Sequence, residues 1–272
     1  MNDTKQRRLH ATLRILFAVT AALAMLLQIA AFLTSTETNT NYYEIGSILP
    51  ILSAGVALLA AAIGSVDAFV FPPRATMPAK RIGFATLPSA IGFAVAGIHL
   101  LLMKTTTFGM ICAILLLAAA IYCVLDLFNL RQYDQALACL GFTGIIGCML
   151  LTGYHYFDST IEMNAPCKVL LQIALLCAML FFTSEVRFKM NILAPRLSRM
   201  LCTWMIASGA IAALPMIFAY LFGTIDRADY LTGAILILGV TVTAVIRLVS
   251  LYTGASDETA AEPEDDTTDT TI

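Results

Sequence analysis

Four charged side chains lie inside long apolar stretches of the chain, or within one turn of the end of such a stretch, and are the first candidates for chemistry. They are three carboxylates and one guanidinium: Asp67, Asp126, Glu185 and Arg247. A charge at the centre of a bilayer costs about 2.5–3.5 kcal/mol on insertion scales, and such residues often mark substrate pathways, proton relays or ion pairs. All four lie near one end of their stretch. They are therefore treated as one candidate cluster, the inner charge cluster.

Asp126 and Arg247 are predicted to pair with each other. At 1.5 Å of rise per residue, each lies roughly 4–8 Å inside the end of its stretch, and no other cation lies at that depth. Glu185 has a partner on its own helix, because Lys189 follows four residues later. Asp67 has no such neighbour and must reach water, take up a proton or find a cation on another helix. An alternative is that each charge simply extends to water and headgroups.

A second set of polar residues is expected near the opposite ends of the stretches, and it comprises Glu44, His99 and His155. An imidazole beside a carboxylate can relay protons or bind a metal ion. These three residues lie on three separate segments with no motif spacing, so hydrogen bonding between helices is the preferred interpretation. The sequence predicts no metal, no cofactor and no catalytic residue.

The composition shows which elements must hold these side chains. The 272 residues are 59% hydrophobic and 12% charged, with a mean hydropathy of +0.84. Soluble domains are about 45–50% apolar and about 25% charged. A fold of this size cannot bury such an excess from water. This excludes a soluble enzyme, a nucleic-acid-binding protein and a disordered chain, and it makes the lipid bilayer the predicted partner.

Eight apolar stretches are long enough to span a bilayer as helices, which takes about 20 residues each. They are Ile15–Leu33, Gly46–Gly64, Ile82–Met103, Phe108–Phe128, Ala136–Phe157, Val169–Val186, Leu201–Phe222 and Tyr230–Tyr252. Runs that are apolar on every face exclude the alternating pattern of a β-barrel. The predicted fold is an all-α polytopic bundle with eight spans.

The distribution of Lys and Arg predicts the orientation of the bundle. With the N-terminus inside, thirteen cations fall on the cytoplasmic side and three on the other. The thirteen are Lys5, Arg7, Arg8, Arg14, Arg74, Lys80, Arg81, Arg131, Arg187, Lys189, Arg196, Arg199 and Arg247, and the three are Lys104, Lys168 and Arg227. Both termini are predicted to be cytoplasmic, in the plasma membrane. Tyrosines at the span ends, Tyr230 and Tyr252 among them, are predicted to anchor the interface.

The chain divides into a basic N-terminus (1–14), two four-helix halves (15–128 and 136–252) and a disordered acidic tail (255–272). Landmarks recur between the halves, for example Pro50 with Pro166 and Arg81 with Arg199. An even number of spans would make this a parallel repeat about the membrane normal. The alternative is that two sets of helices of similar length share landmarks by chance.

No sequence motif identifies an activity. HExxH, GxGD, Walker A and GxGxxG patterns are all absent, which disfavours an enzyme. Two functions remain. The favoured one is a non-enzymatic accessory or scaffolding bundle that contacts other membrane proteins. The alternative is a permease for a small solute, with a site between the two halves. Pro50, Pro88 and Pro215 are predicted to kink their helices.

Overall fold

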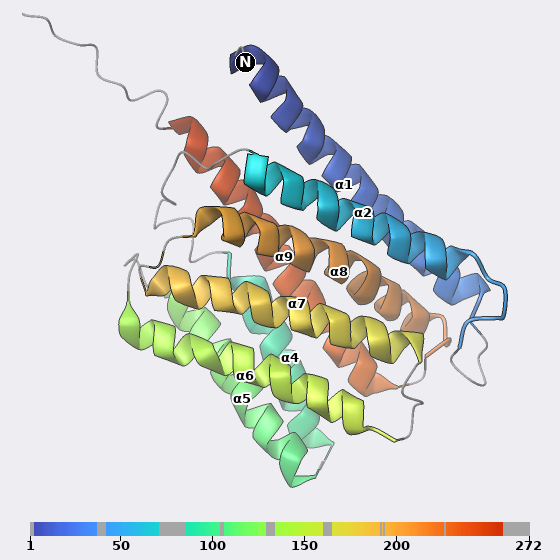
Figure 1. Cartoon of the computed structure of the whole chain (residues 1–272). Helices are drawn as coiled ribbons and strands as arrows, with labels where there is room; N and C mark the ends of the chain where they lie inside the picture. The colour runs from blue at the N-terminus through green and yellow to red at the C-terminus, as the bar shows by residue number, and fades with distance from the viewer. Residues whose placement is uncertain are drawn as a thin grey trace, which may run out of the picture.

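The computed structural model describes residues 3–36, 42–70, 85–103, 106–128, 134–159, 165–190, 192, 194–225 and 227–257. Within these ranges the chain forms eight α-helices and no strand, apart from one isolated bridge between Thr36 and Tyr43 (Figure 1). The helices are α1 (Asp3–Thr34), α2 (Leu49–Val70), α4 (Leu87–Leu102), α5 (Thr107–Phe128), α6 (Gln135–Phe157), α7 (Pro166–Lys189), α8 (Pro195–Leu221) and α9 (Ala228–Asp257).

The predicted fold class, a helical membrane bundle, is confirmed. Seven of the described helices are long and apolar enough to cross a membrane. The eighth, α4, has 16 residues, so it is only about 24 Å long against a hydrocarbon core of about 30 Å. Over the described ranges, the bundle therefore has seven long helices and one shorter apolar helix.

Proline marks where several helices begin. Pro88 lies in the first turn of α4 and Pro50 in the first turn of α2, where the missing N–H has no partner to lose. The predicted kinks at these two positions are therefore wrong, whereas Pro215 does lie inside α8. The third helix accordingly starts at Leu87, which is later than the predicted start at Ile82. Residues 82–84 lie outside the described part of the chain.

The first and last helices are longer than predicted. Helix α1 begins at Asp3 and includes most of the expected basic N-terminus, which places His10 and Arg14 on its first turns. Helix α9 continues to Asp257, so residues 255–257 of the expected tail are helical. Residues 258–272 lie outside the described part of the chain, as do five of the cations that set the predicted orientation: Arg74, Lys80, Arg81, Lys104 and Arg131.

Helices α8 and α9 form the centre of the bundle. Helix α8 packs against α1, α2, α7 and α9, and α9 packs against α4, α7 and α8. In Figure 1 the α1–α2 pair lies along one side of α8, whereas α4 lies with α9 behind α7. The second predicted half thus contacts both hairpins of the first. The internal repeat itself stays a prediction.

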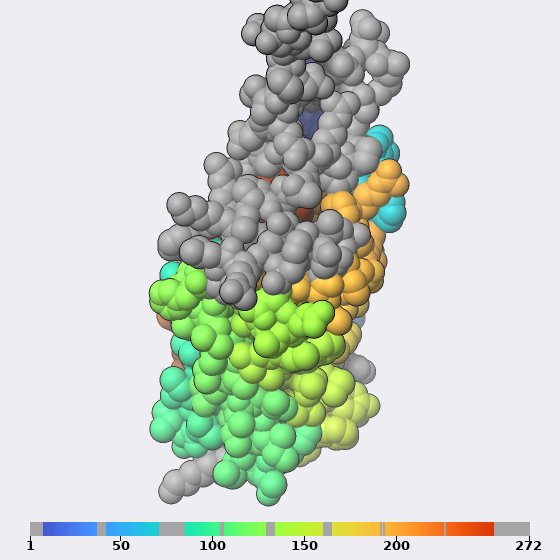
Figure 2. All heavy atoms as spheres, turned by 90° about the vertical axis from the view of Figure 1, so that its left-hand side faces the viewer, coloured from blue at the N-terminus to red at the C-terminus, as the bar shows by residue number. Residues whose placement is uncertain are grey.

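The start of α1 and the end of α9 lie at the same end of the bundle, because Tyr252 of α9 contacts His10 and Arg14 of α1. This end is named the N/C end here, and the opposite one the far end. Figure 2 looks onto the N/C end, where the ends of α2 (cyan) and α8 (orange) lie close together and the green ends of α5 and α6 lie further along the bundle.

Two glycines let α4 and α9 approach closely. A Cβ atom at Gly239 would lie 2.3 Å from the carbonyl oxygen of Pro88, and one at Gly92 would lie 2.9 Å from the Cα atom of Leu236. Helices in a bilayer gain little from apolar burial against each other, so close backbone contact at small residues contributes much of their association. The α4–α9 crossing depends on these glycines.

Replacing Gly239 with valine should push α4 away from α9 and lower the free energy of unfolding by about 1–3 kcal/mol, the usual cost of overpacking. Unfolding of the purified chain by sodium dodecyl sulfate in mixed micelles measures this change. Gly55→Val is the matched control, because a Cβ atom at Gly55 of α2 meets nothing within 4 Å. Equal stability of the two variants would contradict the assigned crossing.

Candidate functional site

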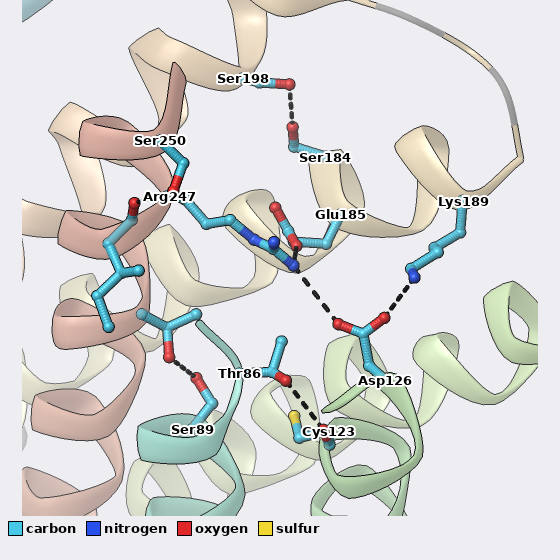
Figure 3. Close-up of polar contacts among 12 residues, drawn as sticks. Thr86, Ser89, Cys123, Asp126, Ser184, Glu185, Lys189, Ser198, Arg247 and Ser250 are labelled. Atoms are coloured by element: carbon cyan, nitrogen blue, oxygen red, sulfur yellow. Dashed lines mark hydrogen bonds and ion pairs between the residues drawn. The ribbon is translucent and has the colours of Figure 1, made fainter. Parts of the chain in front are cut away.

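Three members of the inner charge cluster form one chain of ion pairs at the N/C end. The carboxylate of Asp126 on α5 contacts the ammonium group of Lys189 on α7 and lies 3.5 Å from Nη2 of Arg247 on α9. The same Nη2 atom lies 2.5 Å from Oε2 of Glu185 on α7. Figure 3 shows the resulting order, Lys189–Asp126–Arg247–Glu185. We name these four residues the ion chain.

The ion chain is sequestered inside the protein. The Asp126 and Arg247 side chains are 0% and 1% exposed, and Lys189 is 3% exposed. The predicted Asp126–Arg247 pair is therefore present, and the alternative that these charges reach for water is wrong. The predicted pairing of Glu185 with Lys189 on the same helix is wrong: Lys189 pairs with Asp126 on α5, and the Glu185 carboxylate pairs with Arg247 on α9. Two positive and two negative charges balance.

Neighbouring hydrogen bonds hold the helix ends around the ion chain (Figure 3). The hydroxyls of Ser184 on α7 and Ser198 on α8 lie 2.7 Å apart, and the Thr86 hydroxyl donates to the carbonyl oxygen of Cys123 on α5 at 2.9 Å. The backbone N–H of Asp134, the residue that caps α6, donates to the carbonyl oxygen of Lys189. The helix ends that present the charges are thus linked to one another.

Asp67 belongs to a different network at the same end of the bundle. Its Oδ1 atom lies 2.5 Å from Nδ1 of His10 on α1, and its Oδ2 atom accepts a hydrogen bond of 2.7 Å from the Tyr252 hydroxyl on α9. Arg14 lies 2.7 Å from Nε2 of His10, and its guanidinium stacks 3.6 Å above the Tyr252 ring. We name Asp67, His10, Arg14 and Tyr252 the Asp67 network.

The inner charge cluster of the sequence is therefore two networks that share helix α9. The ion chain joins α5, α7 and α9, and the Asp67 network joins α1, α2 and α9. Arg199 at the start of α8 adds a further link, because its guanidinium donates to the carbonyl oxygen of Ala68 on α2 and lies 5.9 Å from the Tyr252 ring. Charged side chains from most of the bundle converge at the N/C end.

The structure does not bring the second candidate set together. Glu44 is exposed on the connection between α1 and α2, His99 is half-buried on α4, and His155 is buried on α6. Within the part of the chain that the structure describes, no hydrogen bond, ion pair or ring contact joins these three residues, and no group of three His, Cys, Asp or Glu side chains could hold a metal ion. Over their described residues, helices α4 and α6 each pack against α5 but make no comparable contact with each other.

His155 instead has neighbours on α6 and α9 at the far end. Its ring centroid lies 5.0 Å from that of Tyr230 and 5.5 Å from that of Tyr154. Tyr230 is 1% exposed, so the prediction that it anchors the lipid interface is wrong. Lys168 is equally buried, and its ammonium donates to the carbonyl oxygen of Asp158 at 2.7 Å.

An ion-pair cluster lies over this buried pair of rings. Arg227, in the connection before α9, lies 3.1 Å from carboxylate oxygens of both Asp158 and Asp229. Burial by itself lowers the pKa of the Arg227 guanidinium, but the hydrogen bond and charge of Asp229 and the charge of Asp158 outweigh it and raise this pKa. The guanidinium stays charged and holds the start of α9 against the end of α6.

Many residues of these networks did not stand out in the sequence as candidates. Five of the clearest cases are His10, Lys168, Arg199, Tyr230 and Tyr252. His10 and Arg14 are four residues apart, which is a helical spacing, so extending the first helix to its true start would have indicated their shared face. The two tyrosines show no such signal, since a tyrosine at a span end is typical of interface anchoring.

Comparison of the chain with known protein families, curated proteins and solved structures found no match. The function is therefore inferred from the geometry of the described residues.

Asp126→Ala should leave Lys189 unpaired in the interior and destabilise the protein by about 3–5 kcal/mol, the usual cost of breaking a buried ion pair. The variant Asp126→Ala with Lys189→Ala should recover part of that loss, because the remaining Arg247–Glu185 pair is neutral. Detergent unfolding of both variants measures the difference. If the two side chains contributed independently, the double variant would be less stable than Asp126→Ala. That result would contradict the ion pair.

Proposed function

We propose that the protein is a permease for a small solute and that the ion chain forms its gate at the N/C end. The observation that supports this most strongly is the complete burial of Asp126 and Arg247 between α5, α7 and α9. Charged residues inside a spanning bundle are costly, and those that face its interior commonly serve ion or solute pathways.

Stability alone does not account for the ion chain. Replacing a buried set of ion pairs by well-packed apolar side chains is often neutral or stabilising. The chain keeps four charges here instead, on helices that close one end of the bundle. Ion pairs can exchange their partners for water when helices separate, whereas apolar packing has no such substitute. A closure that must open and close again is better made from ion pairs.

The two ends of the bundle are held in different ways, which supports a gated pathway. The N/C end is closed by the ion chain and the Asp67 network. At the far end the ion pairs of Arg227 lie on the surface, with 38% of its side chain exposed. In an alternating-access carrier, one end is closed while the other can reach the solute. The difference between the two ends supports a carrier that is closed at the N/C end.

A second candidate is the accessory or scaffolding bundle favoured by the sequence. It is supported by the tight crossings of α9 with its neighbours: a Cβ atom at Gly209 of α8 would lie 1.9 Å from the Thr241 hydroxyl oxygen, and Gly239 meets Pro88. A rigid centre of this kind suits a protein whose role is contact. We rank it second because it assigns no role to the ion chain.

We further propose that the N/C end faces the cytoplasm and that the protein lies in the plasma membrane. The excess of cations on that side supports this orientation. Green fluorescent protein fused to either end of the chain should therefore fluoresce in bacterial cells. Alkaline phosphatase inserted after Ser159, at the far end, should be active. Active phosphatase at either terminus would contradict the orientation.

The gate is tested with the native cysteines. Cys123 lies one turn before Asp126 and is 0% exposed, and Cys112 on the same helix lies near the far end and is equally buried. In Asp126→Ala with Lys189→Ala, loss of a link worth about 1.4 kcal/mol should raise the opening of the N/C end about tenfold. Labelling of Cys123 by a membrane-impermeant maleimide should accelerate by that factor, measured by peptide mass spectrometry.

Two comparisons make this test specific. Cys112 should keep its labelling rate, because the far end is unchanged. Asp158→Ala with Arg227→Ala removes an ion pair from the far end and should leave the Cys123 rate unaltered. If both cysteines became reactive together, the ion chain would be a structural element of the fold rather than a gate.

Transport is tested in liposomes that contain the purified chain. We expect small solutes from a mixed panel of neutral and charged compounds to enter faster than in protein-free liposomes, as measured by osmotic swelling. The double variant of the ion chain should change that rate. Impermeability of the wild type and the variant to every solute would favour the scaffolding function.

A further inference from the structure

We propose that His155 and Tyr230 form a binding site for a small uncharged solute with hydrogen-bonding groups, at the far end between α6, α7 and α9. Both residues are 1% exposed, and their rings lie 5.0 Å apart. Nδ1 and Nε2 of His155 and the hydroxyl of Tyr230 have no hydrogen-bond partner among the residues that the structure describes.

These three atoms require partners from outside the described chain. A buried polar group without a hydrogen bond costs about 1–3 kcal/mol, so native proteins rarely retain one without a role. A neutral imidazole offers one donor and one acceptor, and a tyrosine hydroxyl offers both. A molecule that donates and accepts hydrogen bonds, such as an amide or an alcohol, fits this set.

The surrounding charges indicate that the solute is uncharged. The charged groups that act on His155 among the described residues are Asp229, Asp158, Lys168 and Arg227, two of each sign. The Lys168 ammonium donates to the backbone carbonyl oxygen of Asp158, and Arg227 pairs with both carboxylates. These four charges sum to zero, so the described surroundings of the site have no net charge with which to neutralise an ion, and an unpaired ion there is strongly disfavoured.

A glycine keeps the backbone of α9 close to this site. A Cβ atom at Gly233 would lie 2.9 Å from Leu171 of α7 and 3.6 Å from Nε2 of His155. Gly233 is one turn after Tyr230, so it faces the same side of α9. Any side chain at this position would therefore press on Leu171 and change the surroundings of the His155 ring.

As a substrate site, this inference rests on the proposed permease function, because a carrier closed at the N/C end would take up its solute at the far end. Binding itself can be measured without transport. The experiment below therefore uses the purified full-length chain in detergent, so that its result is independent of the liposome assay.

The test observes the imidazole ring directly. The chain has three histidines, so labelling with ring-¹⁵N histidine produces few nuclear magnetic resonance signals, and His155→Gln identifies that of His155. Acetamide, acetate and acetamidinium are the probes, since they share a shape but are neutral, negative and positive. Acetamide should shift the His155 signals saturably, with an affinity of about millimolar for so few atoms. The signals of His10 and His99 should stay in place.

A pair of tyrosine variants separates binding from folding. Tyr230→Phe should weaken acetamide binding about five- to tenfold, the effect of one lost hydrogen bond. It should not lower the melting temperature, because this hydroxyl has no partner among the described residues. Tyr156→Phe is the matched control, as it removes a hydroxyl from the 45% exposed Tyr156 at the same end of the bundle. It should leave binding unchanged.

Three results would overturn the site. The first is a His155 signal that no acetamide concentration saturates, which would leave water as the sole partner, and the second is an equal response to acetate or acetamidinium. The third is a lower melting temperature for Tyr230→Phe, which would make its hydroxyl structural. Binding without transport in liposomes would keep the site and reject the permease. Transport without binding would reject the site and keep the permease.

Discussion

The exclusion of water from a bilayer is the constraint on which the rest of the structure depends. A charged side chain in that environment must find its partner inside the protein. Asp126 and Arg247 satisfy this requirement by meeting between α5, α7 and α9, and Lys189 and Glu185 complete a neutral set. The path of these three helices at the N/C end follows from the need to bring the four charges together.

The same constraint explains why α9 is central. This helix supplies Tyr230 to the far end, Arg247 to the ion chain and Tyr252 to the Asp67 network. Gly239 has no side chain, so α4 approaches α9 closely there, and α8 approaches α9 closely where its own Gly209 faces Thr241. Apolar helices in lipid gain little from burying one another, so close packing along the middle and polar links at the ends together determine which helices are neighbours.

The two ends of the bundle have different chemistry. Every charge of the ion chain has an opposite charge beside it, and Asp67 is held by His10 and Tyr252. At the far end, the ion pairs of Arg227 and Asp158 are complete as well, yet the buried His155 and Tyr230 beneath them keep unused hydrogen-bonding atoms within the described residues. Our proposals rest on this contrast between ion-paired charges at the N/C end and neutral polar atoms without a described partner at the far end.

By itself the sequence determined the fold class and the Asp126–Arg247 pair, because hydrophobic length is a local property and a lone deep cation leaves few choices of partner. It also placed Asp67, Asp126, Glu185 and Arg247 at one end of the bundle. Only the tertiary structure decided that Asp67 joins His10 rather than Arg247, that Glu44, His99 and His155 stay apart, and that Tyr230 is buried. Those outcomes depend on which helices become neighbours and on how each is rotated about its axis. In a chain whose helices are apolar on nearly every face, hydrophobic periodicity carries little information about either.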